Sequence, residues 1–468
     1  MTAPLRIALA QANPRLAAIQ ANAARLRALR ARAAALGADL LVTPESSLSG
    51  AVPATLAAHP DFAAALTATL AALAAETADG GPALLLGAPW RNGAALHEAL
   101  HLLDAGTLRS RAAHEPRAGY DPGPVPGPVA FRTARLGLMP ARDGRGPAVA
   151  ETLAETGADL LIALDSPPHA PGAAERRLQS ALARVVENDL PLIRLDRLGA
   201  EDEAAHDGGA LVLNADRSPA LILPPFAEDT ITLTEWHHDG TVWRCAPQAA
   251  PPPMPEHEAT WRALLLALRD HAERWGATSF LLPLSDSPES ALAATLARDA
   301  FGSAAIRAIL LEGEGEAAAR ALGLTAERID LSPARATLAA ILPATPGLAA
   351  RLREAALDTL AEAGGMPILT GTLATSTAEA FAPLRHLPPE TRAALAAWRV
   401  ALRPENLSGA PFEAEIPHPP HGATPDPSRH LWQSLAREDY KRRRAPPGVA
   451  LTPPARPSPP NPQGAATP

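Results

Sequence analysis

Residue types that can act as nucleophiles or as amine cations are scarce in this 468-residue chain. It contains one cysteine, Cys245, and one lysine, Lys441, and its other basic residues are arginines. A single cysteine excludes an intrachain disulfide and a cysteine-rich metal site. Any mechanism that needs a lysine outside the C-terminal region is excluded as well.

Two turns that follow apolar runs carry polar residues suited to chemistry. Glu45 follows the run Asp39–Thr43, and a Ser- and acid-rich segment, residues 285–290, follows the run Ser279–Leu284. In the second turn, Ser287 followed by Pro288 is typical of a helix N-cap with proline at the first helical position. The simpler interpretation of that turn is therefore structural, and a binding role needs further support.

The elements that must position these turns alternate between strands and helices. In the first half, helical spacing over Leu16–Leu36 and Ala148–Thr156 separates short apolar runs, and Gly37 and Gly157 fit helix C-caps. This pattern predicts a layered α/β domain. The predicted strands are Leu5–Ala10, Asp39–Thr43, Ala83–Ala88, Leu136–Met139, Asp159–Ala163, Leu190–Leu195 and Ala210–Leu213.

A second α/β unit follows a proline-rich stretch. A predicted helix, Ala259–Trp275, opens it, and the alternation of strands and helices predicts a doubly wound parallel sheet. Ligands of such sheets bind beyond the carboxyl ends of the strands, which here means the turns after Leu284 and Leu369. The predicted strands are Ser279–Leu284, Ala305–Leu311, Arg328–Leu331 and Pro367–Leu369.

These patterns divide the chain into four parts. Residues 1–245 form the first domain, 246–256 a semi-rigid linker, 257–448 the second domain, and 449–468 a proline-rich tail that we expect to be disordered. A short helix is predicted over His430–Arg437.

Composition favours a folded protein in aqueous surroundings. The chain is 47% hydrophobic and 20% charged, so it can bury a sizeable core. The formal net charge of −8 argues against nucleic acid or an anionic membrane as the main partner. No apolar run approaches the ~18 residues of a membrane span, and the N-terminus lacks the order of a signal peptide, so we expect a cytoplasmic location.

The order of segments resembles glutamine-dependent NAD+ synthetases along nearly the whole chain. That family joins a nitrilase-type (carbon-nitrogen hydrolase) glutaminase, an αββα sandwich, to a Rossmann-like ATP-pyrophosphatase-type synthetase domain. The resemblance rests on collinear stretches: LRIALAQANP, GADLLVTPESSLSG, PGPVPGPVAF, VAETLAETGADLLIAL, DGGALVLNAD, WRCAP, LTG before FAPL, and EDYKRRRAPPG.

The resemblance implies a glutaminase site that lacks two of its three reactive groups. Glu45 falls at the position of the catalytic base. The family's nucleophilic cysteine is replaced by Ala141, and no lysine occupies the stretch from Arg111 to Pro116, where His114 is the other group able to carry a positive charge. Cys245 is interpreted as a small buried residue and not as a substitute nucleophile. We therefore expect Glu45 to be vestigial.

The resemblance also implies ATP and Mg2+ as cofactors of the second domain, held by a Ser-Gly-Gly-x-Asp-Ser loop. Here that loop reads Ser285-Asp286-Ser287-Pro288-Glu289-Ser290, without either glycine. The candidate ATP-binding residues are Ser285, Ser287, Glu289 and Ser290, and Glu289 stands at the position of a metal-binding aspartate. Asp286 places negative charge where phosphates would lie and Pro288 removes an N–H donor, so both residues disfavour the binding of ATP.

Other family motifs persist in part. Arg351, Arg353 and Lys441 are the candidate substrate-binding residues for deamido-NAD+, while the family's Thr-Gly-Asn-Lys-Ser-Glu appears as residues 370–375 without its lysine. The family reaction is the ATP-dependent amidation of deamido-NAD+ with ammonia from glutamine.

Three functional hypotheses follow. The first is a synthetase that is active with free ammonia despite its unusual ATP loop, or is impaired by that loop. The second is a non-catalytic partner that binds an active synthetase in a mixed oligomer; if the chain does not bind such a partner, we expect a homo-oligomer. The third is a small-molecule binding module built on the pocket around Glu45.

Overall fold

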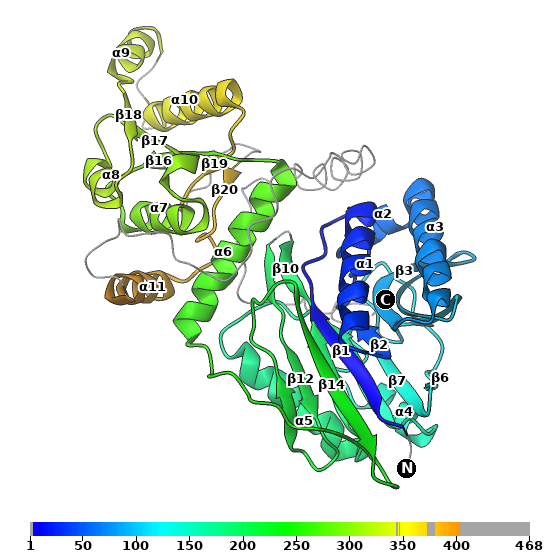
Figure 1. The fold of residues 1–468 in the computed structure, drawn as a ribbon. Helices are drawn as coiled ribbons and strands as arrows, with labels where there is room; N and C mark the ends of the chain where they lie inside the picture. The colour runs from blue at the N-terminus through cyan, green and yellow to red at the C-terminus, as the bar shows by residue number, and fades with distance from the viewer. Residues whose placement is uncertain (1–2, 202, 343–344, 346, 372–379, 403–468) are drawn as a thin grey trace, which may run out of the picture.

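The computed structural model describes residues 3–201, 203–342, 345, 347–371 and 380–402. Within these residues, the first domain contains two large mixed sheets (Figure 1). The first sheet has the order β15-β14-β1-β2-β3-β4-β5, and the second has the order β13-β12-β9-β8-β7-β6. Their bounds are β1 (Leu5–Gln11), β2 (Leu40–Val42), β3 (Ala83–Asn92), β4 (Ala95–Asp104), β5 (Thr107–Ala112), β6 (Val129–Phe131), β7 (Ala134–Pro140), β8 (Leu160–Asp165), β9 (Leu192–Asp196), β12 (Ala210–Leu213), β13 (Pro219–Ile222), β14 (Thr230–His238) and β15 (Trp243–Cys245).

The alternation of side chains along each strand produces four layers. In β1, Leu5, Ile7 and Leu9 pack between the two sheets, while Ala8 and Ala10 pack against helices on the outer face. The first sheet is covered by α1 (Ile19–Ala35) and α3 (Pro60–Glu76), and the second by α4 (Ala148–Glu155) and α5 (Ala173–Asn188). The domain is therefore an αββα sandwich, as the family resemblance implies.

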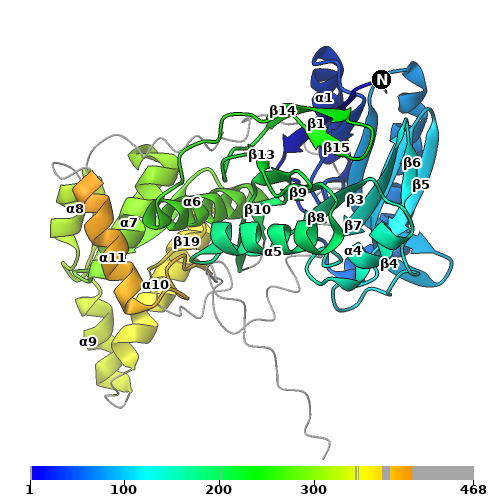
Figure 2. The same ribbon diagram turned by 90° about the horizontal axis from the view of Figure 1, so that it is seen from below.

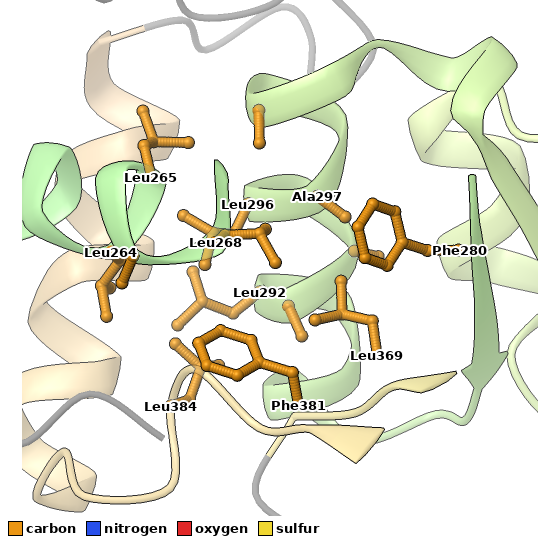
Figure 3. Close-up of a cluster of buried hydrophobic side chains, with 14 of the residues drawn as sticks. Leu264, Leu265, Leu268, Phe280, Leu292, Leu296, Ala297, Leu369, Phe381 and Leu384 are labelled. Atoms are coloured by element: carbon orange, nitrogen blue, oxygen red, sulfur yellow. The ribbon is translucent and has the colours of Figure 1, made fainter. Parts of the chain in front are cut away.

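The second domain is built on a parallel sheet with the order β18-β17-β16-β19-β20 in the described part of the chain. One face packs against α6 (Glu256–Trp275) and α7 (Pro288–Phe301), and the other against α10 (Leu348–Gly364). Figure 3 shows the first of these cores, where Leu264 and Leu268 of α6 meet Leu292 of α7 and Phe381 of β20. The remaining bounds are β16 (Phe280–Leu284), β17 (Ile306–Leu311), β18 (Ala326–Ile329), β19 (Ile368–Leu369), β20 (Ala380–Phe381), α8 (Glu316–Leu322), α9 (Ser332–Ile341) and α11 (Pro389–Leu402).

Helix α6 joins the two domains. It lies beside the hairpin of β10 (Leu198–Glu201) and β11 (Ala204–Asp207), which extends from the first domain (Figures 1 and 2). Leu198 and Ala205 of the hairpin belong to the same buried core as Trp261 of α6. The first domain thus contributes side chains to the core of the second.

The predicted elements agree with the structure at most positions, with two corrections. The predicted strand Arg328–Leu331 is wrong by two residues, because Ala326–Ile329 pair with Ala308–Leu311. Asp330 instead accepts hydrogen bonds from the N–H and hydroxyl of Ser332, at the start of α9. The second correction is that the predicted set lacks the observed strands β4, β5, β6, β10, β11, β13, β14, β15 and β20. In the described residues, no helix is both long and apolar enough to span a bilayer. The predicted helix His430–Arg437 and the tail lie outside the described residues.

Candidate functional site

Glu45 lies in the loop that follows β2, and the backbone of that loop crosses strand β3 at Gly87. A Cβ atom at Gly87 would lie 2.9 Å from Glu45 Cα and closer still to the Ser46 nitrogen, so a side chain there would push the loop away. Ser46 adopts a φ of +56°. The hydroxyl of Thr43 is 2.9 Å from that of Ser47. These contacts hold the Glu45 side chain, which is 5% exposed, at the carboxyl end of the sheet.

Ala141 lies opposite Glu45, directly after β7. Its φ of +52° is a conformation that costs free energy in a residue with a Cβ. The side chain is 3% exposed and lines one pocket with Glu45, Glu98 and Arg117. The structure therefore brings together Glu45 and position 141, where the resemblance implies a nucleophile and this chain has a methyl group.

Asp143 fixes the turn that holds Ala141. It is fully buried, and its N–H donates to Pro140 O. Its carboxylate accepts hydrogen bonds from the backbone N–H groups of His114 and Glu115. These bonds connect the turn at Ala141 to the loop at residues 114 and 115. Burial raises the pKa of the Asp143 carboxyl.

The cation in the pocket is Arg117, which sequence reasoning missed. Its backbone N–H and its Nε both donate to the Glu98 carboxylate. His114, the expected alternative, directs Nδ1 to within 3.1 Å of Gly123 O and is not among the pocket residues. The signal that could have revealed Arg117 is Glu98, an acidic residue in a strand that was not predicted.

Glu45 occupies an environment that disfavours its charge. Burial raises its pKa to about 7, the nearby Glu98 and Asp165 carboxylates act in the same direction, and Arg117 opposes them. The Ser166 hydroxyl donates to Glu45 Oε2 at 2.5 Å. A carboxyl group with this pKa is suited to proton transfer near neutral pH.

A network of ion pairs, buried except at Arg145, contacts Ser166 through Asp165. Asp165, the last residue of β8, accepts from the Ser166 N–H and pairs with Arg145 through two hydrogen bonds. Arg194 Nη2 lies 3.4 Å from Asp165 Oδ2, and Arg194 Nε lies 2.9 Å from Asp196 Oδ1. The network continues through Arg177, Asp207 and His169. It connects the Glu45 pocket to the hairpin that enters the second domain.

Cys245 is far from this chemistry in the fold. It ends β15, is fully buried, and its backbone N–H donates to Asn214 Oδ1. Burial raises the pKa of its thiol to about 12, which keeps it protonated and unreactive at neutral pH.

In the second domain, the loop after β16 forms a helix N-cap. Ser287 Oγ accepts the N–H of Ser290 at 3.1 Å, and Ser290 Oγ accepts the N–H of Ser285 at 3.0 Å. The hydroxyls of Ser285 and Ser287 are also 3.1 Å apart. The polar groups of the three serines therefore bond chiefly to one another.

The neighbouring segment closes on this loop. Asp286 Oδ1 accepts the N–H of Gly315 at 2.9 Å, and a Cβ at Gly315 would lie 2.6 Å from Leu284 Cβ. Glu312, in the same segment, pairs with Arg353 at 2.7 Å. The segment around Gly315 thus contacts the turn after β16 through its backbone.

The other candidate residues are dispersed. Glu289 lies 3.7 Å from Arg392 of α11, Arg351 is exposed on α10, and Lys441 lies outside the described residues. Among the described residues, no cluster of three or more His, Cys, Asp or Glu side chains is arranged to hold a metal ion.

Comparison with known proteins places these observations in context. Residues 6–234 match the carbon-nitrogen hydrolase family. The chain is 33% identical over 398 residues to the glutamine-dependent NAD(+) synthetase of Rhodobacter capsulatus, covering 79% of this chain and 72% of that one. It is 27% identical over 474 residues to the enzyme of the same name from Xanthomonas campestris pv. campestris, covering 89% and 82%.

A solved structure shows the same fold. The glutamine-dependent NAD+ synthetase from Acinetobacter baumannii, in complex with ADP, superposes with a TM-score of 0.76 at 20% identity, over 88% of this chain and 84% of that one.

Proposed function

The chain belongs to the glutamine-dependent NAD+ synthetase family. We propose that it is a non-catalytic member of that family, because both of its reactive sites lack essential groups. The observation that carries the proposal is Ala141. It lines the Glu45 pocket on a turn with positive φ, and a methyl group offers no atom that could attack an amide carbon. Glu45 could accept a proton in this pocket, but the side chain at position 141 has no nucleophilic atom that could donate one.

ATP and Mg2+, which the family implies, do not fit the loop after β16. A phosphate-binding turn needs free N–H donors and a close approach of the backbone. Here the Gly315 N–H is bonded to Asp286, Pro288 has no N–H, and the Asp286 carboxylate would repel a phosphate. Glu289 is directed toward Arg392. We assign no step to these cofactors.

Glutamine hydrolysis tests the proposal for the first domain. We expect the purified full-length protein to release no glutamate above the rate of a buffer control when it is incubated with glutamine at pH 7.5. Glutamate release that is abolished in the Glu45→Gln variant would contradict the proposal, because it would show that another group in this pocket replaces the thiol.

A second candidate function is small-molecule binding. It is supported by the preservation of the pocket itself, since Glu45, Glu98 and Arg117 remain together around Ala141. Ligand-induced stabilisation without turnover is the expected behaviour of such a module.

A further inference from the structure

Helix α6 presents a buried carboxylate to the first domain, where the helix lies beside β10 (Figure 2). Three groups of the first domain donate hydrogen bonds to the Asp270 carboxylate: Asn13 Nδ2 at 3.0 Å, Arg15 Nη1 at 3.0 Å and the Ala200 N–H at 2.7 Å. Glycine at position 199 permits this approach, because a Cβ there would lie 2.2 Å from Asn13 Oδ1. These contacts of Asp270, here called the latch, join the two domains through polar groups beside their shared apolar core.

Arg15 is the one cation of the latch, and carboxylates of both domains share it. Toward α6, Arg15 Nε lies 2.7 Å from Glu273 Oε2. Toward the first domain, Arg15 Nη2 lies 3.6 Å from Glu228 Oε1. Glu228 also lies 3.0 Å from Arg25 Nη1, and Arg25 Nε lies 3.5 Å from Asp229 Oδ1. Docking of α6 therefore brings its carboxylates to a pair of arginines that already face two carboxylates of the first domain.

Glu228 is the carboxyl group of this cluster whose charge is disfavoured. Burial raises its pKa to about 7 from an ordinary value of 4.5, its two arginine neighbours oppose the change, and the Asp270 carboxylate adds to it. The contribution of Asp270 exists while α6 lies against the first domain. The charged groups that face Glu228 or share its arginines are Arg15, Arg25 and Asp229 from the first domain and Arg269, Asp270 and Glu273 from α6.

We propose that the latch is a pH-sensitive device, in which Arg15 holds α6 through Asp270 and Glu273 and the ionisation of Glu228 loosens that hold. Ionised Glu228 competes for Arg15 and repels the Asp270 carboxylate across the junction. Because docking of α6 raises the pKa of Glu228, the docked form is favoured most at low pH, and this advantage is lost as the pH rises through 7. The inference goes beyond the proposed function and does not depend on whether the chain catalyses a reaction.

The test is hydrogen–deuterium exchange of the full-length protein at pH 6 and pH 8, followed at the Ala200 N–H, which donates to Asp270. Each rate is expressed as a protection factor, which removes the intrinsic dependence of exchange on pH. We expect the wild-type protection factor to fall by about fivefold, as for a carboxyl group whose pKa rises by about one unit, to about 7, on docking. In Glu228→Gln, which keeps the size of the side chain and removes its charge, we expect a change below about twofold.

The matched comparison within the same protein is β2, a fully buried strand in the middle of the first sheet. Exchange of its amides requires opening of the first domain itself, so their protection should fall less than that of Ala200 between the two pH values. Equal losses in β2 and at Ala200 would overturn the proposal, because Glu228 would then act on the stability of the whole domain. A wild-type protection factor at Ala200 that does not change with pH would also overturn it, and this result needs no variant to fold.

Discussion

Asp143 accepts the backbone N–H of Glu115 at 2.7 Å, and this bond ties the turn that carries Ala141 to the loop that carries Arg117. The buried carboxylate also accepts the His114 N–H, so two donors of the loop depend on it. Ala141 retains a positive φ within this framework. The backbone that would present a nucleophile to Glu45 is therefore held in place, and what position 141 lacks is a nucleophilic atom on its side chain.

Returning a thiol to this scaffold tests that conclusion. We predict that Ala141→Cys gains a thiol that reacts with iodoacetamide at pH 8, while the wild-type protein, whose Cys245 is buried with a raised pKa, does not react over the same time. The measurement is the mass increase of the intact protein. If the variant is modified no faster than the wild type, position 141 does not face an open pocket.

The pKa of Glu45 predicts a pH dependence of stability. Because the folded-state pKa is raised to about 7 from an ordinary value of 4.5, Glu45 contributes stability that is full below pH 4.5 and is lost as the pH rises through 7. Glu45→Gln should remove this contribution, by up to about 1.4 kcal/mol per pH unit within that window. Glu228, whose pKa is also raised to about 7, acts with the same sign and remains in both proteins.

Urea unfolding of the wild type and Glu45→Gln at several values between pH 5 and 8 measures the difference in the free energy of unfolding. Parallel curves for the two proteins would contradict the raised pKa.

The ion pair of Asp299 and Arg399 should be essential for the second domain. Both side chains are fully buried, and two hydrogen bonds of 2.8 Å join them. Arg399→Ala removes both of these hydrogen bonds from a fully buried carboxylate, to which Trp261 Nε1 still donates, and we expect a loss of about 3–5 kcal/mol in the free energy of unfolding.

The matched control is Arg27→Ala, which breaks a pair with Glu76 whose side chains are 42% and 40% exposed. Here the expected loss is below about 1 kcal/mol. If the two variants lose similar amounts of unfolding free energy, burial does not determine the free-energy cost of removing the arginine.

The N-cap interpretation of Ser287 can be separated from a ligand-binding role. Ser287→Ala removes the acceptor of the Ser290 N–H and should cost about 1 kcal/mol, whereas Ser287→Gly should cost a few tenths. Thermal unfolding in the presence and absence of ATP and Mg2+ is the measurement. Stabilisation of the wild type by the nucleotide, lost in both variants, would favour a binding loop over a simple cap.

Sequence patterns predicted the layers well because apolar runs dominate the buried strands. Strand β16 is a continuous apolar segment, strand β1 is apolar except for Arg6 and Gln11, and both are found where they are predicted. Strand β4 was missed because His97, Glu98 and His101 interrupt its apolar pattern, although all three side chains are buried. Their polar groups find partners only in the folded protein, as when His101 lies between Ser110 and Ala88 O.

The candidate site was predicted incompletely for the same reason. Glu45 and Ala141 follow predicted strands, and the family resemblance is what marks them as site positions. Arg117 lies in a loop, and its position depends on Glu98 and on the bonds of Asp143 to that loop. Spacing along the chain carries no information on such contacts. The closure of residues 312–315 onto Leu284 likewise depends on tertiary structure.

The most direct test of the central claim is NAD+ formation by the purified full-length protein from deamido-NAD+, ATP and Mg2+ with saturating ammonium. Ammonium replaces the glutaminase reaction, so the assay depends on the second domain, including the loop containing Asp286 and Pro288, and not on the Glu45 pocket. We predict no NAD+ above the level of a reaction without protein, from a sample shown to be folded by its thermal transition. Sustained turnover that requires ATP would contradict the account, because it would show that this loop accommodates the nucleotide.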